Sequence, residues 1–145
     1  MIPQPMFSQA KDSQRILVVD HVAANRFLLR LCLQHAGYQV DEAGSGGQAL
    51  ALVRQTGAPA LVILDVLMPD MDGFAVAEAL QSLGTAPIIF LSALSDSAIK
   101  TQALNCYGKD YMTKPCNFAE LLTCIQRVLA PIQYHTKGDV GNQVY

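Results

Sequence analysis

The chain has 145 residues, of which 51% are apolar and 15% are charged. This length suits a single domain, and this composition favours a packed core over disorder. Because the net charge is −2 and the Lys and Arg side chains are scattered along the chain, we expect no nucleic-acid binding by this domain alone.

Neither a signal peptide nor a membrane span is expected. Residues 1–14 hold two prolines and no long apolar run, and no stretch approaches the roughly 20 apolar residues of a membrane-spanning helix. We therefore expect a cytoplasmic protein without membrane contact. The cysteines show no C-x-x-C pair and no metal-type spacing, which predicts ordinary thiols at Cys32, Cys106, Cys116 and Cys124.

The first strand and helix follow the N-terminal residues. Arg15–Val19 is an apolar run that predicts a buried strand ending at Asp20. Ala23–His35 predicts a helix that stops at Gly37. This helix has apolar residues at Phe27, Leu28, Leu31 and Cys32, and we expect its side with Arg26 and Arg30 to be more exposed to solvent.

Predicted strands and helices also alternate in the middle of the chain. Gln39–Ala43 predicts a brief strand, the glycines of 44–47 a loop, and Gln48–Gln55 a short helix. Leu61–Leu64 is the most apolar strand candidate and ends at Asp65. After a turn at Met68–Gly73, a helix is predicted at Phe74–Leu83, with Val76, Leu80 and Leu83 on one face.

The last part supplies two more strands and two more helices. Ile88–Leu91 predicts a strand that ends at Ser92, and Ser95 is the expected cap of a helix reaching about Asn105. Lys109–Thr113 predicts a short strand before Lys114 and Pro115. Asn117 and Glu120 resemble a capping box for a final helix with one apolar stripe, formed by Phe118, Leu121, Leu122, Ile125, Val128 and Leu129.

This alternation predicts an α/β fold with a parallel sheet that helices cover on both faces. We expect a flexible N-terminal extension (1–13), one domain (14–130) and a polar tail or linker (131–145). In parallel sheets of this kind, ligands bind beyond the carboxyl ends of the strands.

Polar side chains follow four of the predicted strands, namely Asp20 with His21, Asp65, Ser92 and Lys114. Each alone has an ordinary explanation, since a strand-end Asp caps a turn, a Ser bonds to nearby backbone and a Lys is solvated. Together they suit a dianionic group and its cation. Asp can form an aspartyl phosphate, carboxylates can hold Mg²⁺, and Lys can pair with phosphate oxygens.

Four segments carry a family resemblance: ILVVDHVAANRFLL (16–29), LVILDVLMPDMDG (61–73), IIFLSAL (88–94) and YMTKP (111–115). With them the chain resembles the receiver family of two-component response regulators over about residues 15–129. The resemblance implies a flavodoxin-like (βα)5 fold, a doubly wound five-stranded parallel sheet with strand order 2-1-3-4-5.

The resemblance also implies roles for individual residues. Asp65 would be the phospho-acceptor, and Asp20, Asp65 and the backbone carbonyl of Leu67 would bind Mg²⁺. Ser92, Lys114 and Tyr111 would be the switch residues: Ser92 bonds the phosphoryl group, Lys114 pairs with it, and Tyr111 changes rotamer as Ser92 moves. The Lys114–Pro115 bond would be cis. Leu67 and Leu94 would control phosphate lifetime, and because apolar side chains cannot orient an attacking water, we expect slow hydrolysis.

His21 is the main departure, because the family has a second acid there that binds the metal directly. Two interpretations stay open. In one, His21 points aside or a water replaces it, and Asp20 with Asp65 binds Mg²⁺ weakly. In the other, His21 changes the preferred metal or supplies a positive charge when protonated. A second departure is Tyr107, where the family has a helix-ending glycine, so the end of that helix is expected to be irregular.

We expect a phosphorylation switch and not an enzyme beyond its own phosphorylation and dephosphorylation. A histidine kinase or phosphotransfer protein would be the donor, and a downstream protein or an output domain the target; homodimer formation stays open. The alternative is a receiver-like interaction module that works without phosphate, supported only by His21. A haloacid-dehalogenase-like phosphatase would need an acid at Leu67, and a flavodoxin-like cofactor binder would need its glycine loop after the first strand.

Overall fold

Five parallel strands form one sheet in the computed structural model, which describes residues 14–84 and 86–130. The strands are β1 (Arg15–Val19), β2 (Gln39–Ala43), β3 (Leu61–Leu64), β4 (Ile88–Ser92) and β5 (Gly108–Thr113). Their order in the sheet is β2-β1-β3-β4-β5, as predicted. Val19 pairs with Ala43 on one side and with Leu64 on the other, so the carboxyl ends of neighbouring strands lie level at one edge.

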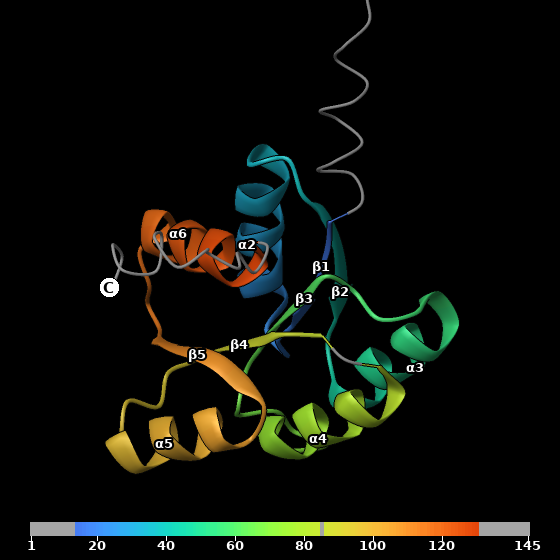
Figure 1. Cartoon of the computed structure of the whole chain (residues 1–145), viewed down its shortest axis with the longest axis vertical. Helices are drawn as coiled ribbons and strands as arrows, with labels where there is room; N and C mark the ends of the chain where they lie inside the picture. The colour runs from blue at the N-terminus through green and yellow to red at the C-terminus, as the bar shows by residue number, and fades with distance from the viewer. Residues whose placement is uncertain (1–13, 85, 131–145) are drawn as a thin grey trace, which may run out of the picture.

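Helices cover both faces of this sheet (Figure 1). They are α2 (Ala23–His35), α3 (Gly46–Thr56), α4 (Gly73–Leu83), α5 (Ser97–Asn105) and α6 (Phe118–Leu129). In Figure 1, α2 and α6 lie on one side of the sheet, and α3, α4 and α5 lie on the other.

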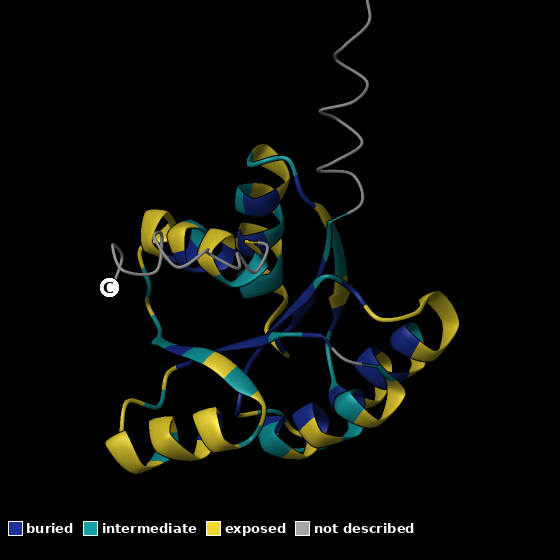
Figure 2. Cartoon of the chain, in the orientation of Figure 1, coloured by how far each residue is buried: buried dark blue, intermediate teal, exposed yellow. Residues whose placement is uncertain are grey.

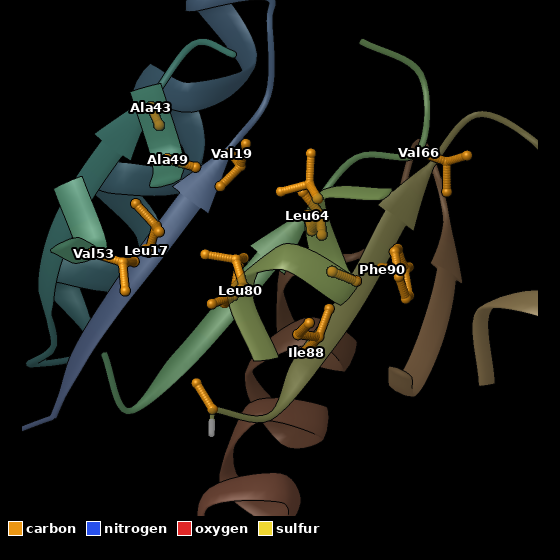
Figure 3. Close-up of a cluster of buried hydrophobic side chains, with 14 of the residues drawn as sticks. Leu17, Val19, Ala43, Ala49, Val53, Leu64, Val66, Leu80, Ile88 and Phe90 are labelled. Carbon is orange, nitrogen blue, oxygen red and sulfur yellow. The ribbon is translucent and has the colours of Figure 1, made fainter. Parts of the chain in front are cut away.

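Alternate residues of each central strand belong to separate hydrophobic clusters. Leu17, Leu64 and Phe90 pack with α3 and α4 in the first cluster, part of which is drawn in Figure 3. Ile16, Ile63 and Ile89 pack with α2 and α6 in the second. Because side chains alternate between the two faces of a strand, continuous apolar runs such as LVIL are needed to build both clusters.

The orientation of α2 differs from the sequence expectation. Phe27, Leu28 and Leu31 are about half exposed, whereas Arg26 and Arg30 are partly buried. Both arginines reach Glu42 on β2, with N–O distances of 3.3 Å and 2.6 Å. These ion pairs hold the arginine side of the helix toward β2 and leave a row of apolar side chains on the surface. Figure 2 colours each residue by burial, and the central strands of the sheet are dark blue.

Several boundaries also differ by one or two residues. Helix α3 begins at Gly46 inside the expected glycine loop, because the Ser45 hydroxyl accepts a hydrogen bond from the Gln48 N–H. Asp96, not Ser95, caps α5 through the Ala98 N–H. Strand β4 includes Ser92, and β5 begins at Gly108.

Two expected core residues lie near the surface. Leu83 and Phe118 are 38% and 40% exposed; Leu83 is the last residue of α4 and Phe118 is the first residue of α6. Asn117 does cap α6, since its side-chain oxygen accepts from the Ala119 and Glu120 N–H groups.

The chain between α5 and β5 is irregular, as the sequence predicted. Tyr107 has φ 67°, the only positive φ of a non-glycine residue in the described part of the chain. A bulge follows, because Ile88 pairs with Gly108 but Ile89 pairs with Asp110. At Gly108 a Cβ atom would lie 2.5 Å from the Ala103 carbonyl oxygen, so only glycine fits this approach.

The expected N-terminal extension (1–13) and polar tail (131–145) lie outside the described residues. No helix within 14–84 and 86–130 has both the length and the apolar character that crossing a membrane requires. The four cysteines are free thiols; Cys124 is buried and the other three are partly buried.

Candidate functional site

The sheet ladder fixes the backbone of the candidate site residues. The Asp20 N–H donates to the Ala43 carbonyl on β2, and the Asp65 N–H donates to the Val19 carbonyl on β1. The Lys114 N–H donates to the Ser92 carbonyl at 2.8 Å. Each residue therefore follows its strand directly, and all of them lie at the same edge of the sheet.

Lys114 joins the two aspartates. Its ammonium nitrogen lies 2.5 Å from Asp20 Oδ2 and 3.0 Å from Asp65 Oδ2. Both aspartates are buried, at 2% and 5% exposure, and burying carboxylates is costly unless they are paired. Burial works to lower the pKa of Lys114, but the bonds to Asp20 and Asp65 outweigh it and raise that pKa above the ordinary value. The side chain is therefore a cation at neutral pH.

Local hydrogen bonds orient the remaining carboxylate oxygens. Asp20 Oδ1 accepts from the Val22 N–H at 2.9 Å, and the Asn25 amide lies 3.4–3.5 Å from both Asp20 oxygens. Asp65 Oδ1 accepts from the Leu67 N–H at 3.1 Å. Two carboxylates face one ammonium, so the cluster has an excess of negative charge that suits a cation.

Helix α4 begins directly against the Asp65 backbone. A Cβ atom at Gly73 would lie 2.3 Å from the Asp65 carbonyl oxygen, and the Gly73 N–H donates to the Val66 carbonyl at 2.7 Å. Gly73 ends the MPDMDG segment, so glycine here allows the loop after β3 to close under Asp65.

Ser92 and Tyr111 meet at Leu94. Ser92 is fully buried, and its hydroxyl accepts from the Leu94 N–H at 3.4 Å, while the Tyr111 hydroxyl donates to the Leu94 carbonyl. Burial raises the pKa of the Tyr111 phenol; the Ser92 hydroxyl opposes this rise and the Asp65 carboxylate adds to it. Tyr111 thus lies inward, within electrostatic reach of Asp65.

His21 lies beside the carboxylates. One ligand atom each from Asp20, His21 and Asp65 can be chosen so that all three lie within 4.8 Å of one another. His21 itself is exposed. Carboxylate oxygens fit a divalent cation, so Asp20 and Asp65 suit the metal that the sequence predicts; the imidazole nitrogen is not a donor that Mg²⁺ prefers. The Leu67 carbonyl stays a predicted ligand, and the Leu67 side chain is 49% exposed.

Three residues near the site were not identified from the sequence. Asn25 touches Asp20, Arg26 donates to the Asp20 carbonyl at 2.7 Å, and Asp70 accepts from the Gly47 and Gly46 N–H groups at 2.9 Å and 3.1 Å. These two backbone bonds lower the pKa of Asp70 and tie the loop after β3 to the start of α3. Asn25 and Arg26 stand in the first helical turn after Asp20, and this closeness in sequence could have predicted that they lie near the site.

A cavity of about 410 Å³ opens beside Lys114. It lies between α2 and the segment after β5, and its lining is mainly apolar. The residues that form it are Asn25, Leu28, Leu29, Leu91, Ala93, Lys114, Pro115, Cys116 and Phe118.

Comparisons with known proteins agree with this fold. A family model described as the response regulator receiver domain matches residues 16–126. The transcriptional regulatory protein KdpE of Mycobacterium tuberculosis is 40% identical over 121 residues, covering 83% of this chain and 52% of that protein. The probable transcriptional regulator ycf27 of Porphyridium aerugineum is 38% identical over 116 residues, covering 80% and 48%. The chain thus spans about half the length of these curated relatives.

Solved structures give the same picture. A CheY-like response regulator receiver domain protein from Methanospirillum hungatei is similar, with a TM-score of 0.75 and 28% identity; 80% of this chain and 93% of that chain are covered. The chemotaxis protein CheY4 of Vibrio cholerae has a TM-score of 0.74 and 33% identity, with 79% and 98% covered.

Proposed function

Because this chain belongs to the response regulator receiver domain family, we propose that it is a phosphorylation-dependent switch of a two-component system with Asp65 as phospho-acceptor. One observation carries the proposal: Lys114 contacts both buried aspartates at the carboxyl edge of the sheet. A protonated ammonium beside an acceptor carboxylate offsets the charge of an incoming phosphoryl group.

In the proposed reaction an Asp65 carboxylate oxygen attacks the phosphorus atom. The new O–P bond forms while the bond from phosphorus to the donor breaks, and the donor leaves with that electron pair. Lys114 stays near the phosphoryl oxygens and compensates their charge. A divalent cation held by Asp20 and Asp65 would supply further charge neutralisation at the same oxygens.

The response would pass through Leu94. Ser92 bonds to the Leu94 N–H and Tyr111 bonds to its carbonyl, so both side chains share one short stretch of backbone. A phosphoryl group on Asp65 would attract the Ser92 hydroxyl and weaken its bond to Leu94. Tyr111 would then move with that loop, which changes the face made by α5, β5 and α6.

The direct test is incubation with acetyl phosphate and a divalent cation, followed by intact mass measurement and mapping of the adduct. We expect one phosphoryl group per chain on Asp65 and none on Asp65→Asn. Lys114→Ala should slow adduct formation strongly. A wild-type chain that gains no adduct with any divalent cation, or an adduct that persists in Asp65→Asn, would favour the phosphate-independent interaction module.

The donor protein would dock over α2. Phe27, Leu28 and Leu31 are exposed apolar residues on this helix, and Leu28 also lines the cavity that reaches Lys114. A protein that delivers a phosphoryl group to Asp65 must cover this side of the site, and apolar side chains would give it a contact surface.

Leu28→Asp should therefore slow phosphotransfer from a histidine kinase that phosphorylates the wild type, by about tenfold or more. Acetyl phosphate is small and needs no docking surface, so its reaction should be unchanged. Leu104→Asp, a change of an equally exposed leucine on α5, is the matched control. Loss of both reactions in Leu28→Asp would mean that the site itself was damaged.

The target of the phosphorylated domain depends on the whole protein. The curated relatives are named transcriptional regulators, and this chain spans about half their length. We propose that the phosphorylated face acts on an output domain or a separate downstream protein. The chain would not act as an enzyme on other substrates.

A further inference from the structure

We infer that this site takes a divalent transition-metal ion such as Mn²⁺ in preference to Mg²⁺, with His21 as a nitrogen ligand. The inference rests on the proposed acceptor site, since it concerns the cation of that same site. It differs from the family pattern, in which an acid stands where this chain has His21.

The positions of the ligand atoms support a shared ion. The selected atoms of Asp20, His21 and Asp65 all lie within 4.8 Å of one another. Metal bonds to oxygen and nitrogen are about 2.0–2.2 Å long, so two ligands of one ion lie at most about 4.4 Å apart. Movements of about 1 Å or less in each ligand atom would therefore bring the three side chains around one ion.

Asp20 and Asp65 are held in place, whereas His21 has room to move toward a metal ion. Asp20 and Asp65 are buried, bonded to Lys114, and further held by the Val22 and Leu67 N–H groups. His21 is exposed and follows Asp20 directly, so its ring has room to turn toward the carboxylates. The site thus has two fixed oxygen ligands and one adjustable nitrogen ligand.

The chemistry of this ligand set disfavours Mg²⁺. Mg²⁺ prefers oxygen, keeps its waters tightly and gains little from a neutral imidazole. Imidazole replaces an acid here, so the site also lacks one negative charge that would attract a hard cation. Transition ions accept imidazole nitrogen together with carboxylate oxygen, and they therefore lose less from the exchange.

The test is calorimetric titration of Mg²⁺ and of Mn²⁺ into the wild type, His21→Asp and His21→Ala. Mn²⁺ is chosen because it stands lowest in the affinity order of transition ions and is least drawn to the free cysteines. We expect His21→Asp to tighten Mg²⁺ binding far more than Mn²⁺ binding, so that the Mn²⁺-over-Mg²⁺ preference falls about tenfold. His21→Ala should weaken Mn²⁺ binding about tenfold and leave Mg²⁺ binding within about twofold.

Nuclear magnetic resonance locates the ion. Mn²⁺ should broaden the amide signals of Asp20, His21 and Asp65 first, and Asp65→Asn should remove this pattern. An equal Mn²⁺-over-Mg²⁺ preference in the wild type, His21→Asp and His21→Ala would overturn the inference, because His21 would then point away from the ion. Early broadening centred on other residues would overturn it as well.

The two proposals fail separately. Acetyl phosphate labelling at saturating Mg²⁺ and at saturating Mn²⁺ tests Asp65 as acceptor, whichever ion binds more tightly. Labelling of Asp65 with an unchanged metal preference rejects only the role of His21. An altered preference without labelling in either metal rejects only the phospho-acceptor function.

Discussion

Among single residues, Leu67 and Leu94 are the two that the sequence predicts to govern access of water to Asp65. Leu67 is 49% exposed, and its N–H donates to the Asp65 carboxylate. Leu94 packs against the first hydrophobic cluster, and its carbonyl accepts from Tyr111. Neither side chain carries a group that could orient a water molecule for attack on phosphorus.

We therefore expect the aspartyl phosphate to decay slowly. The Leu67→Asn, Leu94→Glu double variant should lose phosphate about tenfold faster or more, because its polar groups can position water. Decay is measured by intact mass after acetyl phosphate is removed. The Leu67→Ala, Leu94→Ala double variant is the control, because it reduces side-chain bulk without adding polar groups. Faster decay in this variant would come from easier access of water and not from orientation of the attacking water. Equal decay in the wild type and the polar variant would contradict the prediction.

The sequence could identify some site residues more readily than others. Asp20 and Asp65 follow apolar strands, Ser92 ends β4 and Lys114 follows β5. Because parallel strands align their carboxyl ends, the common location of these residues was predictable. Asn25 and Arg26 instead belong to a helix, and their contacts depend on how that helix lies against β1 and β2. The way α2 packs on the sheet depends on contacts between residues distant in sequence, so the local sequence could not predict it.

At the level of helices and strands, the contact between α4 and Asp65 depends on Gly73. We expect Gly73→Ala to reduce the free energy of unfolding by about 2 kcal/mol or more, since its Cβ would lie 2.3 Å from the Asp65 carbonyl oxygen. Urea unfolding followed by circular dichroism measures this change.

Gly47→Ala is the matched control on α3. Its Cβ would lie 3.6 Å from Asp70 Oδ2, an ordinary contact, so the change should be neutral or stabilise by up to about 1 kcal/mol. A Gly73→Ala protein as stable as Gly47→Ala would show that the loop after β3 yields easily.

The positions of the three central strands were predictable because β1, β3 and β4 are apolar runs bounded by polar or glycine residues, whereas the edge strands β2 (QVDEA) and β5 (GKDYMT) carry a weaker apolar signal. Helix starts were less predictable, since adjacent residues such as Ser95 and Asp96 are equally able to cap and the backbone conformation selects one. The outward side of α2 was also missed, because Arg26 and Arg30 pair with Glu42, which is distant in sequence.

Across the whole molecule, the second hydrophobic cluster contains two buried titratable groups, Tyr38 and Cys124, and Cys124 makes a polar contact between α6 and β5. Cys124 on α6 donates to Asp110 on β5 at 3.1 Å, and Arg127 donates to the same carboxylate oxygen at 2.6 Å. Burial, with the Asp110 carboxylate, raises the pKa of the Cys124 thiol to about 12, from an ordinary value of 9.0.

This pKa predicts a loss of stability in alkali. Between pH 9 and about 12 the folded chain keeps a proton on Cys124 that the unfolded chain releases, so stability falls as pH rises through this window. The fall approaches about 1.4 kcal/mol per pH unit. Cys124→Ser does not titrate there, so it should lose less free energy of unfolding between pH 8 and pH 10.5. Parallel losses in urea titrations of both proteins would refute the assignment.

The outward row of apolar side chains on α2 has a consequence for how such a domain can diversify. Phe27, Leu28 and Leu31 contribute little to either hydrophobic cluster, whereas Leu29 and Leu33 on the same helix are buried in one. Substitutions in the exposed row should therefore cost little folding stability. Under the donor docking proposed above, recognition and structural integrity would be encoded by different residues of one helix, so a new pairing could arise while the scaffold stays the same.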